Sequence, residues 1–391
     1  MLFRNVTLVL PDRLVPGGSL RTGGGWIEAL ATDGGTLDPQ DGEEIVEGGG
    51  AYLAPGFVDL HVHGAAGRDT MEGTDAAFAS ILTFHARGGT TGATLTTTAA
   101  PMPDILRVLA GARGQRPAGG AELLGVHVEG PYFAHSKAGA HRPEWIKPPA
   151  PDETARLLEF ADVITQVTLA PELPGALDLV AQLHAHGVLA SGGHSDAWDD
   201  EAAAAHAAGM TRVTHVFNAM SSARRHDGLR VAGLLEYALA EPSIQCELIA
   251  DGRHVTPTLM RLLYRAKGPD GICLVTDATA GAGLPEGASF LLAGNRCTVR
   301  GGVGVTADGA ALAGSVSTMV EGVRCVVRTL GVPLHEAVRM AATNPAAALR
   351  RGHERGRLAP GLRADLVLLS GALEVLATYV AGTGVFLANR L

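Results

Sequence analysis

The sequence of 391 residues is poor in aromatic side chains and has no long apolar run. Aromatic residues make up 4% of the chain and 52 residues are glycine, a composition that favours tight turns and small-residue packing over an aromatic-rich binding surface. No uncharged apolar run approaches the roughly 20 residues that cross a bilayer, and residues 1–6 lack the basic segment and long apolar run of a signal peptide. We therefore expect a cytoplasmic protein, whose 46% of hydrophobic residues fill a substantial core.

Cysteine and basic charge are also scarce. The four cysteines, Cys246, Cys273, Cys297 and Cys325, are scattered and form no Cys-x-x-Cys pair, which predicts buried thiols in a reducing compartment. The 31 Lys and Arg against 40 Asp and Glu give a formal charge of −9, which repels nucleic acid and anionic membranes overall. The composition thus argues against nucleic-acid or membrane partners and leaves room for a local basic pocket that binds an anionic small molecule.

From about residue 57, short apolar runs alternate with helix-like segments. The runs are Phe57 to His63, Ala93 to Thr98, Leu123 to Glu129, Ile164 to Ala170, Val188 to His194, Arg212 to Phe217, Ile244 to Ala250 and Ile272 to Asp277. The helix-like segments are Asp75 to Ala86, Asp104 to Ala112, Asp152 to Phe160, Ala176 to Ala185, Asp199 to Ala207, Leu234 to Ala240 and Pro257 to Ala266. Several of them begin with Asp or Pro and several end just before Gly, as helices do. Eight such units predict a closed parallel (β/α)8 barrel of the TIM type.

Both flanks of the chain lie outside this pattern. Val6 to Leu10 and Ala364 to Leu369 look like strands, with Gly- and Asp-rich turns around them. We therefore expect residues 1–55 and 351–391 to pair as one small β-sandwich domain beside the barrel, which takes up residues 56–350.

His61 and His63 lie two residues apart on an apolar run, so on a strand both face the same side. For this motif alone, a metal site and a structural pair of histidines are about equally good explanations. Four further polar side chains stand at the ends of later runs: Glu129, His194, His215 and Asp277. Six residues at matching strand ends favour a metal site, because imidazole and carboxylate are ligands for zinc and also for iron, cobalt or manganese.

The same six residues favour the closed barrel over the alternative fold, a doubly wound open sheet. They fall at the ends of the first, third, fifth, sixth and eighth runs. A closed barrel brings all these ends to one face, whereas in an open sheet strands so far apart in order lie at separate positions. Near this face we also expect a flap or short hairpin from Gly281 to Ala313, because this Gly-rich segment is too long for an ordinary βα loop.

The order His-x-His, Glu, His, His and Asp on eight βα units resembles the amidohydrolase superfamily of metal-dependent hydrolases. Within it, the chain resembles the N-acetylglucosamine-6-phosphate deacetylase family over nearly its whole length. The segments that carry this resemblance are His127-Val128-Glu129-Gly130-Pro131, Gly139-Ala140-His141, Gly193-His194-Ser195, Thr214 to Met220, Ala250 to His254, Thr276-Asp277-Ala278 and Leu312 to Ser315. Many binuclear relatives bridge two metals with a carboxylated lysine, but Lys137, Lys147 and Lys267 do not stand at strand ends, so hydantoinases and dihydroorotases are weaker matches.

The resemblance implies hydrolysis of an acetamide, with release of acetate and an amino sugar phosphate. The implied ligands form two sets: Glu129, His194 and His215 for a main divalent metal, zinc first, and His61, His63 and Asp277, with Glu129 shared, for a second one. Some relatives have Gln and Asn in place of His61 and His63 and look suited to one metal. By the same resemblance Asp277 would act as general base and then general acid, and His141 would bind the substrate near the carbonyl.

Recognition of the sugar phosphate would fall to residues around the barrel mouth. The implied set is Ala140, His141, Asn218, Ala219, Arg225, Asp251, His254, Leu312 and Ala313. An arginine suits a phosphate because the guanidinium binds two oxygens at once. We assign this role to Arg225, with its neighbour Arg224 as the alternative. Because the phosphate site of the family is completed across a dimer interface, the resemblance also implies a homodimer.

Two other functions stay open at this stage. The same fold and metal would suit N-acetylgalactosamine 6-phosphate or another N-acetylated small molecule, since a single hydroxyl contact separates two epimers. A non-catalytic barrel that serves in binding or assembly typically loses metal ligands, whereas this chain keeps all six. Asp59 and His127, which flank the ligand motifs, are expected to support the strands or the ligands rather than to bind metal.

Overall fold

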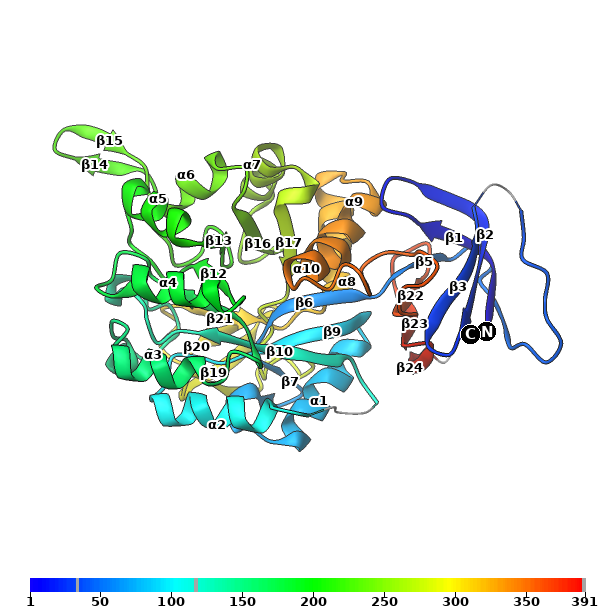
Figure 1. The fold of residues 1–391 in the computed structure, drawn as a ribbon, viewed down its shortest axis with the longest axis horizontal. Helices are drawn as coiled ribbons and strands as arrows, with labels where there is room; N and C mark the ends of the chain where they lie inside the picture. Colours follow the sequence, from blue (N-terminus) through cyan, green and yellow to red (C-terminus); the bar gives the residue numbers. More distant parts are fainter. Residues whose placement is uncertain (33–34, 116–118, 389–391) are drawn as a thin grey trace.

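The computed structural model describes residues 1–32, 35–115 and 119–388, and in this part of the chain eight parallel strands follow one another around a barrel (Figure 1). The strands are β6 (Phe57–Val62), β9 (Thr90–Thr96), β10 (Glu122–Glu129), β11 (Ile164–Leu169), β12 (Leu189–Gly192), β13 (Met210–Val213), β16 (Gln245–Ile249) and β17 (Ile272–Val275). Just past β17, the amide of Asp277 donates to the carbonyl of His61 (2.9 Å), and Ala278 bridges to Val62. The last strand therefore meets the first, which confirms the closed barrel; the open-sheet alternative is wrong.

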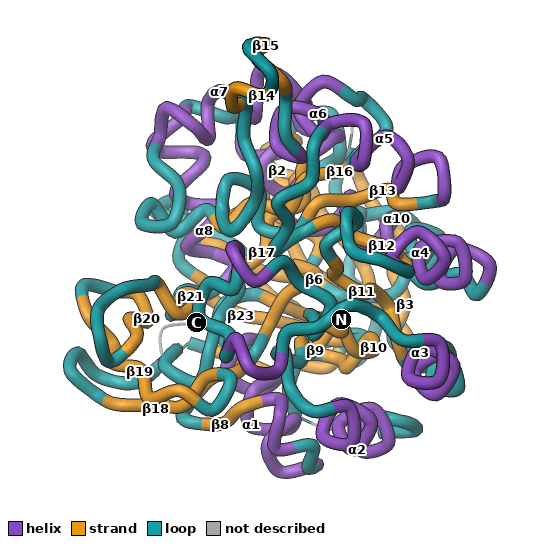
Figure 2. Tube along the Cα trace, turned by 90° about the vertical axis from the view of Figure 1, so that its left-hand side faces the viewer, coloured by secondary structure: helices purple, strands orange, loops and turns teal. Residues whose placement is uncertain are grey.

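Helices surround these strands (Figure 2). They are α1 (Asp75–Ala86), α2 (Met102–Ala112), α3 (Pro151–Leu158), α4 (Ala176–Ala185), α5 (Asp199–Ala208), α6 (Leu234–Ala240) and α7 (Pro257–Lys267), followed by α8 (Met319–Cys325), α9 (Leu334–Val338) and α10 (Asn344–Ala348). The first seven match the predicted segments to within two residues at each end, whereas α8 to α10 have no predicted counterpart. Among the described residues no helix is long and apolar enough to cross a membrane.

Helix α1 illustrates how the sequence places a helix on the barrel. At its start the hydroxyl of Thr74 accepts a hydrogen bond from the amide of Ala77, which satisfies one of the amides that lack a partner within the helix. Its buried residues include Phe78, Ile81, Leu82 and His85. This spacing puts them on one face, so burial of that face fixes the orientation of α1 against the strands.

The residues that precede and follow the barrel in the sequence together form a second sheet, at the right of Figure 1. Its order is β24 (Thr383–Leu387), β23 (Val375–Val380), β22 (Leu366–Leu369), β5 (Tyr52–Pro55), β1 (Leu2–Val9), β2 (Leu14–Gly23) and β3 (Trp26–Ala31), with β4 (Ile45–Glu47) also paired with β1. The antiparallel pair of β5 and β22 joins the N-terminal strands to the C-terminal ones. Both flanks of the sequence thus build one small β domain.

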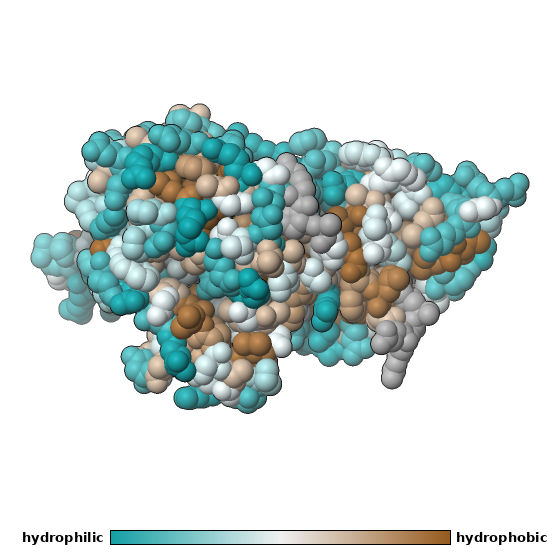
Figure 3. All heavy atoms as spheres, turned by 90° about the horizontal axis from the view of Figure 1, so that it is seen from below, coloured by the Kyte–Doolittle hydropathy of each residue, from teal (hydrophilic) through white to brown (hydrophobic). Residues whose placement is uncertain are grey.

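This sheet folds over itself around its own core. The amide of Ile27 donates to the carbonyl of Leu362 (2.8 Å), and the rings of Phe3 and Tyr379 pack edge to face 5.1 Å apart. Figure 3 shows hydrophobic areas among hydrophilic ones on the lower face of this domain. The exposed large apolar side chains of the domain are Trp26, Ile45 and Leu387. The division of the chain at residues 55 and 351 stays a prediction, and residues 33–34 and 389–391 of the predicted domain lie outside the described residues.

Antiparallel strands are added at the mouth of the barrel. Where the sequence predicts a flap or short hairpin, the described residues form a four-stranded sheet of β18 (Ser289–Leu292), β19 (Asn295–Arg300), β20 (Val303–Thr306) and β21 (Leu312–Ser315). A hairpin of β14 (Arg224–His226) and β15 (Leu229–Val231) projects from the body at the upper left of Figure 1 and has no predicted counterpart. A shorter one joins β7 (Gly64–Ala65) to β8 (Arg68–Asp69).

Candidate active site

The six predicted ligands all lie at the carboxyl ends of barrel strands. His61 and Glu129 belong to β6 and β10, His63 follows β6 directly, and His194, His215 and Asp277 each lie two residues past a strand. These last three have φ angles of 49°, 31° and 49°, in the left-handed region that residues other than glycine seldom adopt. Such backbone strain gathers at functional sites. All six side chains are buried, with Asp277 the most exposed at 8%.

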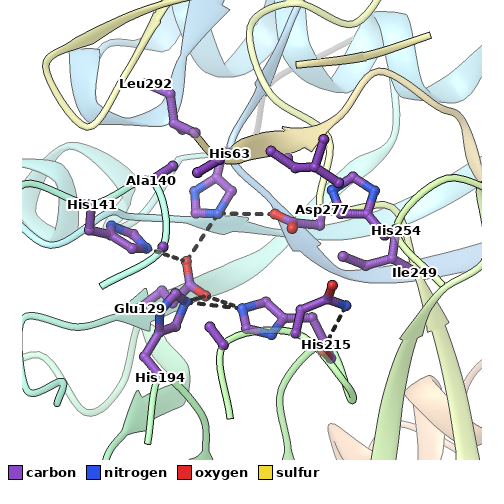
Figure 4. Close-up of a pocket in the computed structure, with 16 residues that line it drawn as sticks. His63, Glu129, Ala140, His141, His194, His215, Ile249, His254, Asp277 and Leu292 are labelled. Atoms are coloured by element: carbon purple, nitrogen blue, oxygen red, sulfur yellow. Dashed lines mark hydrogen bonds and ion pairs between the residues drawn. The ribbon is translucent and has the colours of Figure 1, made fainter. Parts of the chain in front are cut away.

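The carboxylate of Glu129 stands between two sets of side chains (Figure 4). Its Oε1 lies 3.4 Å from Nε2 of His194 and 3.2 Å from Nε2 of His215, and these two nitrogens are 3.1 Å apart. Its Oε2 lies 3.1 Å from Nε2 of His63 and 3.6 Å from Nε2 of His61. The Oδ1 atom of Asp277 lies 3.3 Å and 3.5 Å from the same two nitrogens. The two sets correspond to the two predicted metal sites, with Glu129 shared.

The hydrogen bonds of the histidines suit metal binding. The Nδ1 atom of His63 lies 3.2 Å from the carbonyl of Thr96, and that of His194 lies 2.8 Å from the carbonyl of Lys137. A carbonyl only accepts, so in the neutral ring the proton is on Nδ1 and the lone pair of Nε2 faces the centre. His61 is arranged in the same way, with Nδ1 3.2 Å from the Oε2 atom of Glu247.

Lone pairs and carboxylate oxygens thus face one another at close range and repel unless a cation lies among them. The Oε1 atom of Glu129 is buried without a hydrogen-bond partner among the described residues, which fits an atom that binds an ion. A set of imidazole nitrogens and carboxylate oxygens is a common ligand set for zinc and for neighbouring divalent metals. The residues present therefore fit the metal that the sequence predicts.

The charges at the centre reinforce this preference for a cation. Burial would raise the pKa of the Glu129 carboxyl, but the surrounding histidines, His61 foremost, hold this pKa well below its usual range. Burial likewise opposes ionisation of Asp277, yet His61 and His63 bring its pKa to about 2. Burial lowers the pKa of His63, whereas Asp277 and Glu129 raise it, and it ends at about 9. Protons and metal ions therefore compete for the same nitrogen.

His141 has the opposite tautomer. Its Nδ1 accepts a hydrogen bond from the amide of Ala99 (3.2 Å), so the neutral ring carries its proton on Nε2. That Nε2 lies 3.5 Å from Oε2 of Glu129, within the distance range of the ligand histidines. A nitrogen that carries a proton does not bind a metal but donates a hydrogen bond. The geometry therefore makes His141 a donor that faces the centre.

A cavity of about 250 Å³ opens above these side chains. Of the residues predicted to bind substrate, it is lined by Ala140, His141, Asn218, Ala219, His254 and Leu312 (Figure 4). It is also lined by residues for which the sequence predicts no substrate contact: Gly139, Ile249, Leu292, Ala311 and Gly314. Strand β21 thus contributes Leu312 and β18 contributes Leu292, so the four-stranded addition forms one wall of the cavity.

Three residues of the predicted set are not part of the cavity lining. Ala313 is fully buried beside Leu312. A carboxylate oxygen of Asp251 lies 2.6 Å from Nδ1 of His254, so Asp251 holds His254 in place from behind. Arg225 is exposed on the projecting hairpin.

The neighbouring arginine of this hairpin is engaged within the same chain. Arg224 donates to a carboxylate oxygen of Asp196 (2.5 Å) and to the carbonyl of that residue (2.7 Å), and its guanidinium lies 3.8 Å from the ring centroid of Trp198. Successive residues of a strand point to opposite faces, so the side chain of Arg225 is directed away from this contact. Of the pair, Arg225 is the one available to a ligand outside these contacts.

Of the polar residues below the ligands, the sequence predicts two, Asp59 and His127. Asp59 accepts from the hydroxyl of Thr276 (2.6 Å) and from the amide of His61 (3.3 Å), so it ties β6 to the segment that carries Asp277. The ring of His127 packs edge to face on that of His61, with centroids 4.6 Å apart. Both residues thus lie where the sequence places them, behind the ligands. Glu247 was not predicted, although a charged residue within the apolar run Ile244 to Ala250 was a signal.

Comparisons with known proteins agree with this arrangement. The amidohydrolase family matches residues 52–385. The chain is 36% identical to the N-acetylglucosamine-6-phosphate deacetylase of Vibrio furnissii, over 90% of this chain and 87% of that protein. It is 35% identical to the N-acetylgalactosamine-6-phosphate deacetylase of Escherichia coli O157:H7, over 86% and 89% of the two chains.

A solved structure extends the likeness to the whole fold. It is that of a mutant N-acetyl-D-glucosamine-6-phosphate deacetylase from Mycobacterium smegmatis in complex with N-acetyl-D-glucosamine-6-phosphate. The two chains are 34% identical, the match covers 98% of this chain and 99% of that one, and the TM-score is 0.90.

Proposed function

The chain belongs to the amidohydrolase family, and from this premise we propose that it hydrolyses N-acetyl-D-glucosamine 6-phosphate to D-glucosamine 6-phosphate and acetate. The observation that carries the proposal is the placement of Glu129 between two sets of ligands, with Asp277 and the N–H of His141 at the same centre. Relatives that cover nearly the whole chain and are named for this reaction support the substrate. The enzyme is a hydrolase that acts on a linear amide.

We propose that each subunit holds one or two divalent metals, zinc first, with iron, cobalt or manganese as alternatives. Glu129, His194 and His215 would hold the main metal, and His61, His63 and Asp277 would hold a second one that shares Glu129. When bound, such a metal polarises the amide carbonyl and makes water a stronger nucleophile at neutral pH.

Asp277 and His141 supply the proton transfer and the hydrogen bond that the reaction needs. With its pKa at about 2, Asp277 is ionised at neutral pH, so it accepts the proton of the attacking water. It then returns that proton to the nitrogen as the C–N bond breaks, and the amine leaves neutral. The Nε2–H group of His141 donates to the acetyl oxygen, on which negative charge develops as water attacks the carbonyl carbon.

The cavity walls would hold the sugar. We assign its recognition to Ala140, Asn218, Ala219, His254 and Leu312, which line the cavity. Asp251 acts through His254, and Ala313 acts through the position of Leu312.

We further propose a homodimer in which Arg225 of one copy reaches the phosphate bound by the other. Its exposed position on a projecting hairpin supports this role, as does the engagement of Arg224 within its own chain. On α7, Leu259 and Leu262 are 36% and 48% exposed and give a second copy an apolar surface. We also propose a cytoplasmic location, in keeping with the four free cysteines.

A second candidate is the deacetylation of N-acetylgalactosamine 6-phosphate. It is favoured by the E. coli relative, whose identity to this chain is nearly that of the V. furnissii one. A non-catalytic barrel with a binding or assembly role is the remote alternative, and the complete set of six ligand residues speaks against it.

Release of acetate from four sugars tests these functions. The sugars are the 6-phosphates of N-acetylglucosamine and N-acetylgalactosamine and the two unphosphorylated forms. We expect kcat/KM to be highest for N-acetylglucosamine 6-phosphate, and we expect Arg225→Ala to lower it for the phosphates only. Arg13→Ala, at an exposed arginine of the small β domain, is the control. Equal rates with and without phosphate would show that Arg225 has no such role, and faster turnover of the galactosamine compound would favour the second candidate.

A further inference from the structure

A layer of polar side chains lies inside the barrel, directly below the ligand residues. It contains Glu247 from β16, Arg212 from β13 and Gln166 from β11, and each of them is at most 2% exposed. The interior of such a barrel is usually filled by branched apolar side chains. A charged pair is expensive to bury and is weak evidence for stability, so this layer calls for another explanation.

Glu247 connects this layer to the ligands. Its Oε2 accepts a hydrogen bond from Nδ1 of His61 (3.2 Å), and its Oε1 accepts one from Nε2 of Gln166 (2.7 Å). Arg212 lies 3.5 Å from the same Oε1 and donates its other end to Gln245 (2.6 Å). The carboxylate of Glu247 is therefore fixed on one side, and its free oxygen is aimed at a single ligand histidine.

His61 differs from the other ligand histidines in the partner of its Nδ1 atom. Nδ1 of His63 and of His194 faces a main-chain carbonyl, and Nδ1 of His215 has no partner among the described residues. Of the four ligand histidines, only His61 has a carboxylate behind its ring among the described residues. A carboxylate behind a ligand histidine fixes the orientation of the ring and makes it a better ligand, and its loss commonly weakens metal binding by about 10- to 100-fold.

We propose that Glu247 is a positioning residue that holds His61 for a second metal ion, and that the ion pair with Arg212 keeps Glu247 in place. This inference rests on the proposed function and deepens it, because it assigns to one set of ligands a support that the other set lacks. The chain is thereby built to bind two metals, and the metal at His61 and His63 depends on Glu247, whereas the one at His194 and His215 does not.

Zinc binding to the metal-free protein tests the inference. We would titrate Zn²⁺ alone into the full chain by calorimetry and count bound metal by elemental mass spectrometry. Wild type should bind two ions. Glu247→Gln should bind the first as wild type does and the second about 10- to 100-fold more weakly.

Two further variants separate positioning from folding. Because Glu247→Gln leaves Arg212 buried and unpaired, the double variant Glu247→Gln with Arg212→Met removes both charges and should fold well; it should lose the second ion in the same way. Gln166→Leu is the control, because it removes a contact of Glu247 without touching His61. We expect it to bind both ions with nearly wild-type affinity.

Four other results of the zinc titrations would contradict the inference, and a fifth would contradict the proposed function. The inference is wrong if Glu247→Gln and the double variant bind two ions as wild type does, if both ions weaken equally, or if Gln166→Leu has the same effect as Glu247→Gln. It is also wrong if wild type binds one ion only. A wild-type protein that binds no ion would instead overturn the proposed function itself.

Discussion

Replacement of His141 by phenylalanine tests whether this residue is a hydrogen-bond donor or a metal ligand. By distance alone it qualifies as a ligand, since its Nε2 lies 3.5 Å from Glu129. Its hydrogen bond from the amide of Ala99 places the ring proton on Nε2 and makes it a donor. Phenylalanine keeps an aromatic ring beside Phe133, whose ring centroid lies 5.1 Å from that of His141, and removes both nitrogens.

The size of the effect follows from these contacts. Loss of one donor to a developing oxyanion costs about 2.7–4 kcal/mol, or about 10²- to 10³-fold in kcat. The buried amide of Ala99 would also lose its acceptor, which lowers the free energy of unfolding by about 1–3 kcal/mol. The bound metal should not change, because no ligand is removed.

Steady-state release of acetate, together with elemental analysis of the protein, gives the answer. His141→Gln is the matched control, since one amide can accept from Ala99 and donate toward the substrate, and it should keep more of the kcat than His141→Phe. If His141→Phe lost metal in proportion to its activity, His141 would be a ligand. A fall in kcat of less than about tenfold, with metal retained, would refute its role as a donor.

Three further predictions concern proton transfer, metal affinity and stability. Asp277→Asn removes the proposed acid and base, so kcat should fall by about 10²- to 10⁴-fold; full acetate release by a variant shown to be folded would contradict this role. Because the pKa of His63 is about 9, this residue carries a proton at lower pH that Zn²⁺ must displace. The affinity for Zn²⁺ should therefore fall by up to about tenfold for each pH unit below 9. Calorimetry at several pH values checks this, and an affinity that does not vary between pH 6 and 8 would contradict it. Phe78→Ala removes a fully buried ring from the inner face of α1 and should lower the free energy of unfolding in urea by about 3–5 kcal/mol without changing bound metal; an unchanged unfolding midpoint would mean that the site repacks.

The barrel and its ligands were accessible from the sequence because both depend on simple periodicities. Apolar runs of strand length ended in His, Glu or Asp at corresponding positions, and a parallel barrel gathers such ends at one face. The sequence pattern did not reveal the left-handed φ of His194, His215 and Asp277, because nothing in the residue types requires it. The tautomer of His141 was equally hidden, since it depends on the amide of Ala99, which is distant in the sequence.

Other features had a local signal that was passed over. The projecting hairpin turns at Asp227 and Gly228, both with positive φ, and Asp-Gly is a common two-residue hairpin turn. The sheet at the barrel mouth turns at Gly301 and Gly302 in the same way. The hairpin of β14 and β15 was not predicted, although its turn residues indicate paired strands. The segment from Gly281 to Ala313 was predicted to form a flap or short hairpin, and it forms four paired strands.

The small β domain also sets the order in which the protein can fold during synthesis. Strands β1 to β5 leave the ribosome before any part of the barrel, whereas β22, the antiparallel partner of β5, follows after the last barrel helix. At about 5–20 residues per second, the edge of β5 stays without this partner for on the order of tens of seconds. A nascent chain therefore exposes an open strand edge while its barrel assembles, and the sheet closes only after the whole barrel has been synthesised.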